Sequence, residues 1–335
     1  YKCPVTHKDF EFKGTFYNNG KPRSGFYQTK ESSSEKYLVE DGLPDFCFPR
    51  IEFLPLSDKS SLEWYKNNAL VYDNNLPLTF NTFKADENKE RQYLVDLLNL
   101  KGDETILEFG CGTCRDSEII ASRLNKNANL YLQDISPEIL KIGINKMDKL
   151  ELEPNIEFSI ANAYYLPFSD NSFDRVFHFG GLNTFGDQKK TFREIIRVSK
   201  KGAKVVIGDE NMPLWLRETE FGKVLMNSNP HYKFNLPLED LPVEARNVRL
   251  EWIIGGVFYV ITFDVGEGLP YADLDFSIPG SRGGTHRTRY YGKLEGVTKE
   301  ACDLAAKIVK TKNISMHDWL DKVIKESAKR DLESF

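Results

Sequence analysis

Short apolar runs alternate with amphipathic stretches from residue 105 to residue 207, and this alternation constrains the fold more than any other feature. Five runs have the length and residue types of buried strands: 105–109, 129–133, 156–160, 173–177 and 205–207. The segments between them carry apolar residues at helical spacing. Strands separated by helices of this length predict an α/β fold with a parallel sheet covered on both faces.

Two further apolar stretches, 248–254 and 257–265, flank the dipeptide Gly255-Gly256. A glycine pair between two β-type sequences is typical of a hairpin. The hairpin would add an antiparallel edge to the parallel sheet.

The segment Glu108-Phe109-Gly110-Cys111-Gly112-Thr113-Cys114 follows the first predicted strand and opens a helix. Glycines there let the backbone turn tightly and lie against a ligand. Asp134 ends the next strand, 22 residues after Gly112, where a carboxylate can accept hydrogen bonds from ribose hydroxyls. A nicotinamide dinucleotide site is the competing interpretation, but its pattern Gly-x-Gly-x-x-Gly fails at Arg115.

These segments resemble the motifs of class I S-adenosylmethionine-dependent methyltransferases. The matching segments are 108–114 (the acidic-x-Gly-x-Gly-x-Gly motif), 134–137 (the second strand), 161–168 (around the adenine), 170–174 (the fourth strand) and 197–202 (the turn before the fifth). Within the family, the group related to ubiquinone and menaquinone biosynthesis is the most similar. Tyr72-Asp73 resembles the lead-in segment of that group over the cofactor. The resemblance covers about residues 70–265.

The resemblance implies a seven-stranded, Rossmann-like methyltransferase sheet and S-adenosylmethionine as cofactor, with S-adenosylhomocysteine as its product. It assigns cofactor binding to Tyr72, Glu108, Gly110, Cys111, Gly112, Asp134, Ile135, Asn162, Ala163, His178 and Phe179. Two positions depart from the family pattern: Cys114 replaces the third glycine, and Asn162 replaces an aspartate. The amide oxygen of Asn162 can still accept a hydrogen bond from the adenine amino group.

Methyl transfer mainly requires alignment of nucleophile, methyl group and sulfur, and a base only where the nucleophile must lose a proton. His178, after the fourth predicted strand, is the candidate catalytic residue because a histidine pKa lies near neutral. The competing interpretation is a histidine bonded to a backbone carbonyl beside the sheet. Asn183, in the same loop, is a candidate substrate contact. Trp215 is another, within the insertion 209–247 that would cover the substrate, unless it packs in the core.

A basic loop, residues 280–293, carries four cationic side chains and no acidic one. Three interpretations stay open for it. Arg287 and Arg289 would hold a carboxylate or phosphate of the substrate, or the loop would contact an RNA backbone. Alternatively, its arginines would pair with carboxylates of this protein.

Residues 1–50 are predicted to form a small β-rich module that resembles the zinc-ribbon-like domain of some methyltransferases and tRNA-methyltransferase activators. Cys3, His7 and Cys47 are obvious ligands for zinc, but no fourth is evident, and a structural zinc needs four. We therefore expect a version without metal. The other predicted parts are a lead-in segment and first helix (51–100), the cofactor-binding core (101–266) and the basic loop with a helical extension (267–335).

Within the lead-in segment, 51–85 is expected to be irregular. In the extension, one helix (299–310) should bury Leu304, Ala305 and Ile308. A second, starting at Ser315, should bury Trp319, Leu320, Val323 and Ile324.

Composition limits the partners. Lys plus Arg number 45 against 50 Asp plus Glu, a net charge of −5, which argues against nucleic acid as a general partner without ruling out a local patch. No apolar run is long enough for a membrane helix. Five sparse cysteines suggest a reducing, cytoplasmic location.

The predicted function is methyl transfer to a small organic acceptor, which can carry an anionic group. The alternatives are a macromolecular acceptor (tRNA, rRNA or protein) and a non-catalytic binding subunit. The acceptor atom and the oligomeric state stay open.

Overall fold

The computed structural model describes residues 1–30, 32–291 and 297–334. The chain divides into two compact units, Tyr1–Leu269 and Pro270–Phe335. Within the described ranges, no helix is long and apolar enough to cross a membrane.

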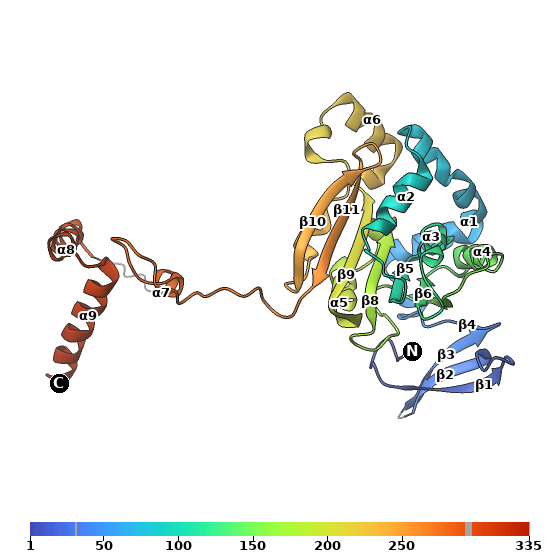
Figure 1. The fold of residues 1–335 in the computed structure, drawn as a ribbon, viewed down its shortest axis with the longest axis horizontal. Helices are drawn as coiled ribbons and strands as arrows, with labels where there is room; N and C mark the ends of the chain where they lie inside the picture. The colour runs from blue at the N-terminus through green and yellow to red at the C-terminus, as the bar shows by residue number, and fades with distance from the viewer. Residues whose placement is uncertain (31, 292–296, 335) are drawn as a thin grey trace. The chain divides into compact units, whose positions relative to one another are not determined.

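A seven-stranded sheet forms the centre of the first unit, in the order β10-β11-β9-β8-β5-β6-β7 (Figure 1). The strands from β9 to β7 run parallel, and β11 is antiparallel to β9 and β10. Their bounds are β5 (Thr105–Phe109), β6 (Asn129–Asp134), β7 (Asn155–Ile160), β8 (Phe173–Phe179), β9 (Ser199–Glu210), β10 (Ala245–Ile253) and β11 (Phe258–Val265). The α/β prediction and the hairpin edge are confirmed. The strand order reverses between β5 and β8, where open α/β sheets bind their ligands.

Helices cover both faces of this sheet. One buried cluster includes Leu94 of α2 and Ile120 of α3, and a second includes Phe192 of α5. In β5, Ile106 belongs to the first cluster and Leu107 to the second, because consecutive strand side chains point to opposite faces. The helices are α2 (Glu87–Asp96), α3 (Arg115–Ser122), α4 (Pro137–Met147), α5 (Gln188–Val198) and α6 (Glu220–Ser228). The 3₁₀ turns are η1 (Ile51–Phe53), η2 (Leu182–Thr184), η3 (Leu214–Leu216), η4 (Pro230–Lys233) and η5 (Pro237–Asp240).

The segment predicted to be irregular forms α1 (Leu56–Thr82), a helix of 27 residues, so that prediction is wrong. Its five asparagines and Pro77 obscure any helical pattern in the sequence. Tertiary contacts stabilise the helix instead: Ala69, Asp73 and Phe80 are buried, and Phe80 packs with Met212 and other residues of the insertion.

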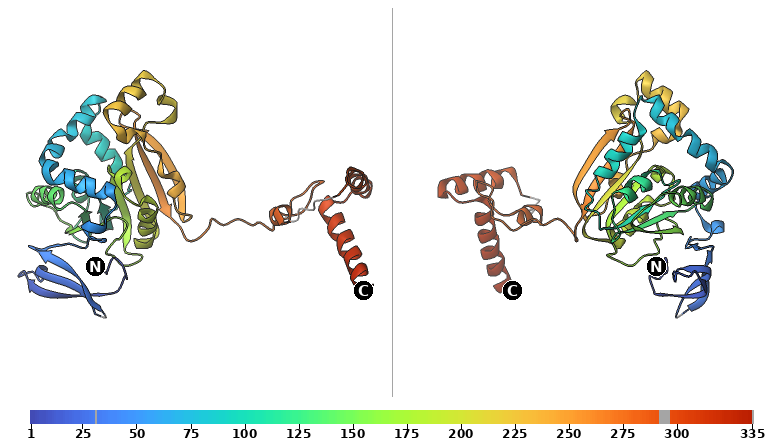
Figure 2. Two further views of the ribbon diagram at one scale, coloured as in Figure 1. Left: turned by 180° about the vertical axis from the view of Figure 1, so that it is seen from behind. Right: turned by 45° about the vertical axis from the view of Figure 1, so that its right-hand side comes forward.

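The N-terminal module is a four-stranded antiparallel sheet of β1 (Phe10–Phe16), β2 (Pro22–Thr29), β3 (Ser32–Glu40) and β4 (Leu43–Pro44). It lies beside the β6–β7 edge of the central sheet (Figure 2), where Phe46 N donates to Ile160 O at 2.8 Å. Cys3 and Cys47 are buried, and their thiols lie 3.9 Å from Tyr37 Oη and 3.8 Å from Pro49 O respectively. The described residues contain no cluster of three or more potential metal ligands. The likeness to a zinc ribbon stays a prediction.

The second unit contains α7 (His286–Tyr291), α8 (Lys299–Lys312) and α9 (Met316–Glu333). Ser315 caps α9 and accepts from Asp318 N at 3.1 Å. The predicted burial of both apolar faces is only partly confirmed, because Ile308, Trp319 and Leu320 are partly buried, whereas Val323 and Ile324 are 38% and 40% exposed. Ala305 and Val309 are buried in α8, but Leu304 is 60% exposed, and no residue of α9 is buried.

Candidate functional site

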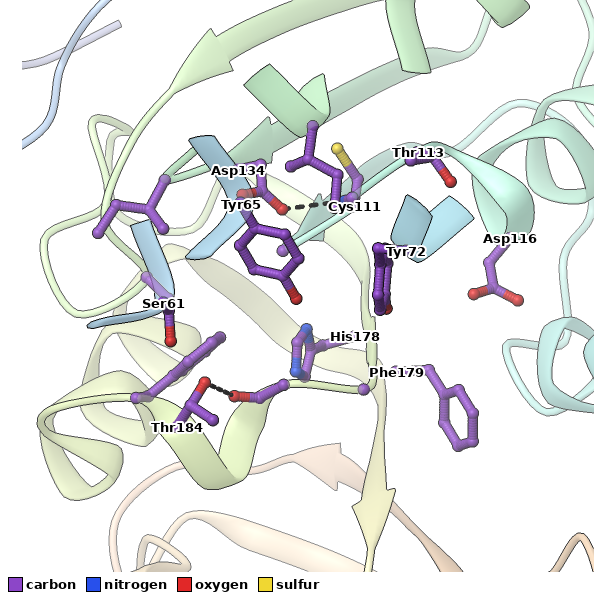
Figure 3. A pocket seen from close by; sticks show the side chains of 18 of the residues that line it. Ser61, Tyr65, Tyr72, Cys111, Thr113, Asp116, Asp134, His178, Phe179 and Thr184 are labelled. Atoms are coloured by element: carbon purple, nitrogen blue, oxygen red, sulfur yellow. Dashed lines mark hydrogen bonds between the residues drawn. The ribbon is translucent and has the colours of Figure 1, made fainter. Parts of the chain in front are cut away.

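A pocket opens at the carboxyl ends of β5, β6 and β8, and α1 lies across it (Figure 3). The loop from Gly110 to Thr113 forms one wall, the residues after β6 and β7 form another, and the turn after β8 forms the floor. From α1, Ser61, Tyr65 and Tyr72 face the pocket.

The glycine loop adopts a conformation that few side chains tolerate. Gly110 has φ +60°, and a Cβ there would lie 2.9 Å from Cε1 of His178. Cys114 also has a positive φ, 64°, and its thiol packs against Gly143 of α4, where an added Cβ would come within 2.5 Å of Sγ. Cys114 therefore fits the position of a third glycine because α4 leaves space for its sulfur.

Asp134 lies beside this loop at the end of β6. Its Oδ2 accepts from Gly112 N at 3.0 Å, and its Oδ1 accepts from Ser136 N at 2.9 Å. Burial raises the pKa of Asp134 to about 6, although these backbone bonds partly offset the effect. The carboxylate is thus held rigidly at the pocket wall with lone pairs left for a ligand.

His178 is completely buried and lies in the pocket beneath the two tyrosines (Figure 3). Its Nδ1 is 2.7 Å from Phe109 O. A carbonyl only accepts, so Nδ1 carries the proton and Nε2 carries a lone pair. Nε2 has no partner in the protein, and burial lowers the pKa of His178 to about 4. The imidazole is therefore neutral at physiological pH and offers one acceptor atom.

Asn162 and the tyrosines of α1 complete the polar lining. Asn162 Oδ1 accepts from Tyr164 N at 3.2 Å, whereas its Nδ2 is buried without a partner. The free group of Asn162 is thus a donor. Burial raises the pKa of Tyr72 to about 12, so its hydroxyl stays protonated. Figure 3 shows the rings of Tyr65 and Tyr72 above His178.

Asp73 and Arg115 fasten α1 over the pocket. Asp73 Oδ1 accepts from Thr113 Oγ1 (2.6 Å), Arg115 Nε (3.2 Å) and Lys146 Nζ (2.7 Å). Burial acts to raise the pKa of Asp73, but its hydrogen bonds and the nearby cations lower it below the usual range. Arg115 Nη2 also donates to the backbone oxygen of Asp73 at 2.6 Å. That carbonyl has no helical partner because Pro77, four residues on, lacks an N–H.

A family model described as "Methyltransferase domain" matches residues 100–257. This range contains the whole parallel sheet, the glycine loop and Asp134. The chain carries a class I S-adenosylmethionine-dependent methyltransferase domain.

Relatives of the methyltransferase domain include ubiquinone/menaquinone biosynthesis C-methyltransferases. The one from Klebsiella pneumoniae is 27% identical over 124 residues, which cover 37% of this chain and 49% of the relative. The one from Haemophilus ducreyi is 27% identical over 125 residues, or 37% and 48%. The chain thus spans about half the length of these relatives. Among solved structures, phosphoethanolamine N-methyltransferase 2 of Haemonchus contortus has a TM-score of 0.48 at 13% identity, and the match covers 69% of this chain and 63% of that one.

The structure brings ten of the predicted cofactor residues together around the pocket of the methyltransferase domain: Tyr72, Gly110, Cys111, Gly112, Asp134, Ile135, Asn162, Ala163, His178 and Phe179. Glu108 lies behind the loop and is not part of the lining. Burial, followed by the charge of Asp116, raises its pKa well above the usual range.

Two of the residues predicted to bind substrate, Asn183 and Trp215, lie in the first unit but do not line this pocket. The side-chain amide of Asn183 donates to Glu210 O at 2.8 Å and its backbone N–H to Asp209 Oδ2 at 2.6 Å, so its donors fasten the turn after β8 to the end of β9. Trp215 is 66% exposed and stacks edge-on with Trp252.

The basic loop belongs to the second unit, and its last two residues, 292 and 293, lie outside the described residues. Arg287 Nε is 3.0 Å from Asp275 Oδ1, and Arg289 Nε donates to Gly283 O at 2.9 Å. The loop backbone also caps α9, because Ser281 O and Arg282 O accept from the N–H groups of Met316 and His317. These contacts favour the interpretation of the loop as a structural element.

Sequence reasoning missed several lining residues of the methyltransferase domain, notably Tyr65, Arg91, Thr113 and Arg115. Tyr65 lies seven residues before Tyr72, which is two helical turns. That spacing was the available signal, and it became visible only once residues 56–82 were known to be helical.

Proposed function

We propose that this chain transfers a methyl group from S-adenosylmethionine to a small organic acceptor. The single observation that carries the proposal is the Asp134 carboxylate, fixed by two backbone N–H groups beside the glycine loop at the end of β6. This arrangement suits the two hydroxyls of a ribose. The names of the relatives, which are C-methyltransferases, support methyl transfer.

Unpartnered buried groups support the placement of the adenine. Asn162 would donate through Nδ2 to a ring nitrogen of the adenine, since its Oδ1 already accepts from Tyr164 N. This differs from the expected contact between the amide oxygen and the adenine amino group. Ile135 and Ala163, which also line the pocket, would flank the ring.

When bound, the cofactor would supply a methyl group on a positively charged sulfur. The acceptor would attack that methyl group from the side opposite the sulfur. His178 suits this reaction because a neutral imidazole does not repel the sulfonium. Its Nε2 can accept a hydrogen bond from an acceptor O–H or N–H group and so orient the nucleophile. With a pKa of about 4, His178 would act mainly by orientation, and a proton lost by the acceptor would pass on to water.

The tyrosines and α1 support an enclosed reaction site. Tyr65 and Tyr72 would exclude water above the transferred methyl group, and their hydroxyls can contact the acceptor. The cations that line this pocket, Arg91 and Arg115, are both paired with carboxylates. An anionic acceptor would therefore have to displace a carboxylate from one of these arginines. The cytoplasmic location stays part of the proposal, and the five cysteines, all described, are free thiols.

Calorimetric titration with S-adenosylmethionine, S-adenosylhomocysteine and NADH tests the cofactor. We expect both sulfur nucleotides to bind at micromolar concentration, and Asp134→Ala to weaken binding strongly. Asp103→Ala removes an exposed carboxylate and serves as the matched control. Wild-type protein that is folded but binds neither sulfur nucleotide would refute the proposal.

Turnover of cofactor to S-adenosylhomocysteine is then measured with a panel of small phenols, enols, amines and carboxylates, alongside an RNA fraction. Turnover with a small acceptor supports the proposal. Turnover with RNA alone would move the chain to the macromolecular class, and binding without turnover on any acceptor would favour a binding subunit.

A further inference from the structure

We propose that the methyl acceptor is an amine, which enters the pocket beneath α1 as the free base and leaves it as a methylated ammonium ion. The inference rests on the proposed methyl transfer and narrows its acceptor from small organic molecules to one chemical class. It differs from the anionic acceptor that the basic loop suggested, and it depends on residues of the first unit alone.

His178 limits which nucleophiles the pocket can serve. Its Nδ1 donates to Phe109 O at 2.7 Å, so Nε2, which has no partner among the described residues, is an acceptor at the pocket. The side chain is completely buried, and a buried imidazolium beside a sulfonium would be costly because two positive charges would share a site with little water. Nε2 can therefore hold an N–H or O–H group in place but is a poor destination for its proton.

The charged side chains of the pocket lining already have partners. Arg91 pairs with Asp116 at 2.7 Å, and Arg115 pairs with a carboxylate of α2 at 2.9 Å. Asp58 accepts from a tyrosine hydroxyl and a backbone N–H, and Asp134 accepts from two backbone N–H groups. Within residues 1–30 and 32–269, the lining thus contains no unpaired cation for an anionic acceptor and no carboxylate that lacks a donor and could serve as a free base.

An amine needs neither a cation nor a base. It would donate an N–H to Nε2 of His178, and its lone pair would form a bond to the methyl carbon while the carbon–sulfur bond breaks. The electron pair of that bond goes to sulfur, which becomes neutral, and the nitrogen gains the positive charge. No proton leaves in this step, whereas an O–H or C–H acceptor would have to lose one to a base.

Aromatic rings surround the place where this charge would arise. The ring centroids of Tyr65 and Tyr72 lie 5.4 Å apart, with the ring planes at 82°, and Figure 3 shows both rings above His178. The ring of Phe185 lies 5.1 Å from that of His178. Because the faces of such rings attract organic cations, the positive charge could pass from sulfur to nitrogen without leaving the aromatic lining.

A carboxylate next to these rings adds negative charge. Phe179 lines the pocket, and the register of β8 with β9 puts the side chain of Glu210 on the same face of the sheet. Its Oε1 accepts from Asn229 Nδ2 at 3.3 Å, and its Oε2 lies 3.5 Å from His231 Nδ1. Burial first, and then the charge of Glu210, raises the pKa of Tyr72 to about 12. Glu210 would therefore stabilise a product ammonium ion and repel an anionic acceptor.

Calorimetry with probes of equal shape tests this charge preference. The probes are choline, its uncharged carbon isostere dimethylbutanol and the matching anion dimethylbutyrate. Each is titrated into the chain saturated with S-adenosylhomocysteine, whose neutral sulfur leaves the acceptor side to be probed alone. We expect choline to bind roughly tenfold more tightly than dimethylbutanol, and dimethylbutyrate not to bind.

A matched pair of variants tests the contribution of Glu210. Glu210→Gln should weaken choline binding roughly threefold or more without changing the affinity for S-adenosylhomocysteine. Glu218→Gln, at a glutamate whose side chain is 91% exposed, is the control and should change neither affinity. Equal choline binding by wild type and Glu210→Gln would overturn the contribution of Glu210.

The same titrations separate the failure of this inference from the failure of the proposed function. A folded chain that does not bind S-adenosylhomocysteine fails both. If S-adenosylhomocysteine binds but choline binds no more tightly than dimethylbutanol, the amine acceptor is overturned, and methyl transfer to another small molecule stands. In the turnover panel, amines should be methylated faster than phenols, enols and carboxylates, and a faster rate for any of those three classes would also overturn the amine acceptor.

Discussion

Replacement of Asp134 by asparagine should stabilise the ligand-free protein while abolishing nucleotide binding. Burial raises the pKa of this carboxyl from 3.8 to about 6. A carboxyl whose pKa is higher in the folded state favours folding only when it is protonated. Its contribution is therefore complete below pH 3.8 and is lost as the pH rises through 6. At neutral pH, the ionised Asp134 therefore lowers the free energy of unfolding. Such a destabilising carboxylate is expected where the group serves ligand binding.

The magnitude follows from the shift. A difference of about 2 pKa units corresponds to about 3 kcal/mol of unfolding free energy at pH 8, at 1.36 kcal/mol per unit. At pH 5 most folded protein already carries the proton, and the cost falls to about half of that value. Asparagine is neutral like the protonated acid, but its amide nitrogen cannot accept a hydrogen bond. One of the two backbone N–H groups therefore loses its acceptor, and the gain in stability stays below the full value of the shift.

Urea unfolding of ligand-free wild type and Asp134→Asn at pH 8 and pH 5 measures this effect. We expect the variant to be more stable by up to about 3 kcal/mol at pH 8 and by about half as much at pH 5. Calorimetry should show no nucleotide binding by the variant, and Asp103→Asn should change neither property. A variant that is less stable than wild type, or a stability gap that does not depend on pH, would refute the desolvation argument. Nucleotide binding by Asp134→Asn with the affinity of the wild type would refute the role of Asp134 in ribose binding.

Three further predictions concern the loop and the helix above it. Asp73→Ala removes the acceptor that fastens α1, and should weaken nucleotide binding several-fold and speed proteolytic cleavage within α1; unchanged cleavage would contradict the fastening role. Gly143→Ala should destabilise the protein in urea unfolding despite the better helix propensity of alanine. The loss of stability should shrink by about 1 kcal/mol in a Cys114→Gly background because the clashing sulfur is gone. If the effects of the two substitutions simply add, the contact between Cys114 and Gly143 is contradicted. Gly110→Ala should weaken nucleotide binding at least roughly tenfold in calorimetry, because a left-handed alanine costs about 1–2 kcal/mol and its Cβ meets His178; near-wild-type affinity would show that the loop adapts.

Local sequence patterns determined the central sheet and most of the predicted cofactor residues. The buried strands were visible because each is a short apolar run bounded by breaks, and the hairpin because of Gly255-Gly256. The N-cap at Ser315 was visible because its signal lies within four residues. Asp134 and the glycine loop were found for the same reason, since a strand end and the turn after it are adjacent in sequence.

The tertiary structure alone decided which side chains close the pocket. The helical state of α1 depends on Asp73 and Phe80 reaching residues far away in sequence, among them Lys146 and Met212, so no pattern within 56–82 could reveal it. Asn183 lies in the predicted loop, but its donors are used by the end of β9, which only the packing shows. The apolar faces of α8 and α9 read as core positions, yet within the second unit Leu304, Val323 and Ile324 are exposed. Periodicity shows that a helix face favours burial, whereas only the three-dimensional structure shows which of its side chains the neighbouring elements cover.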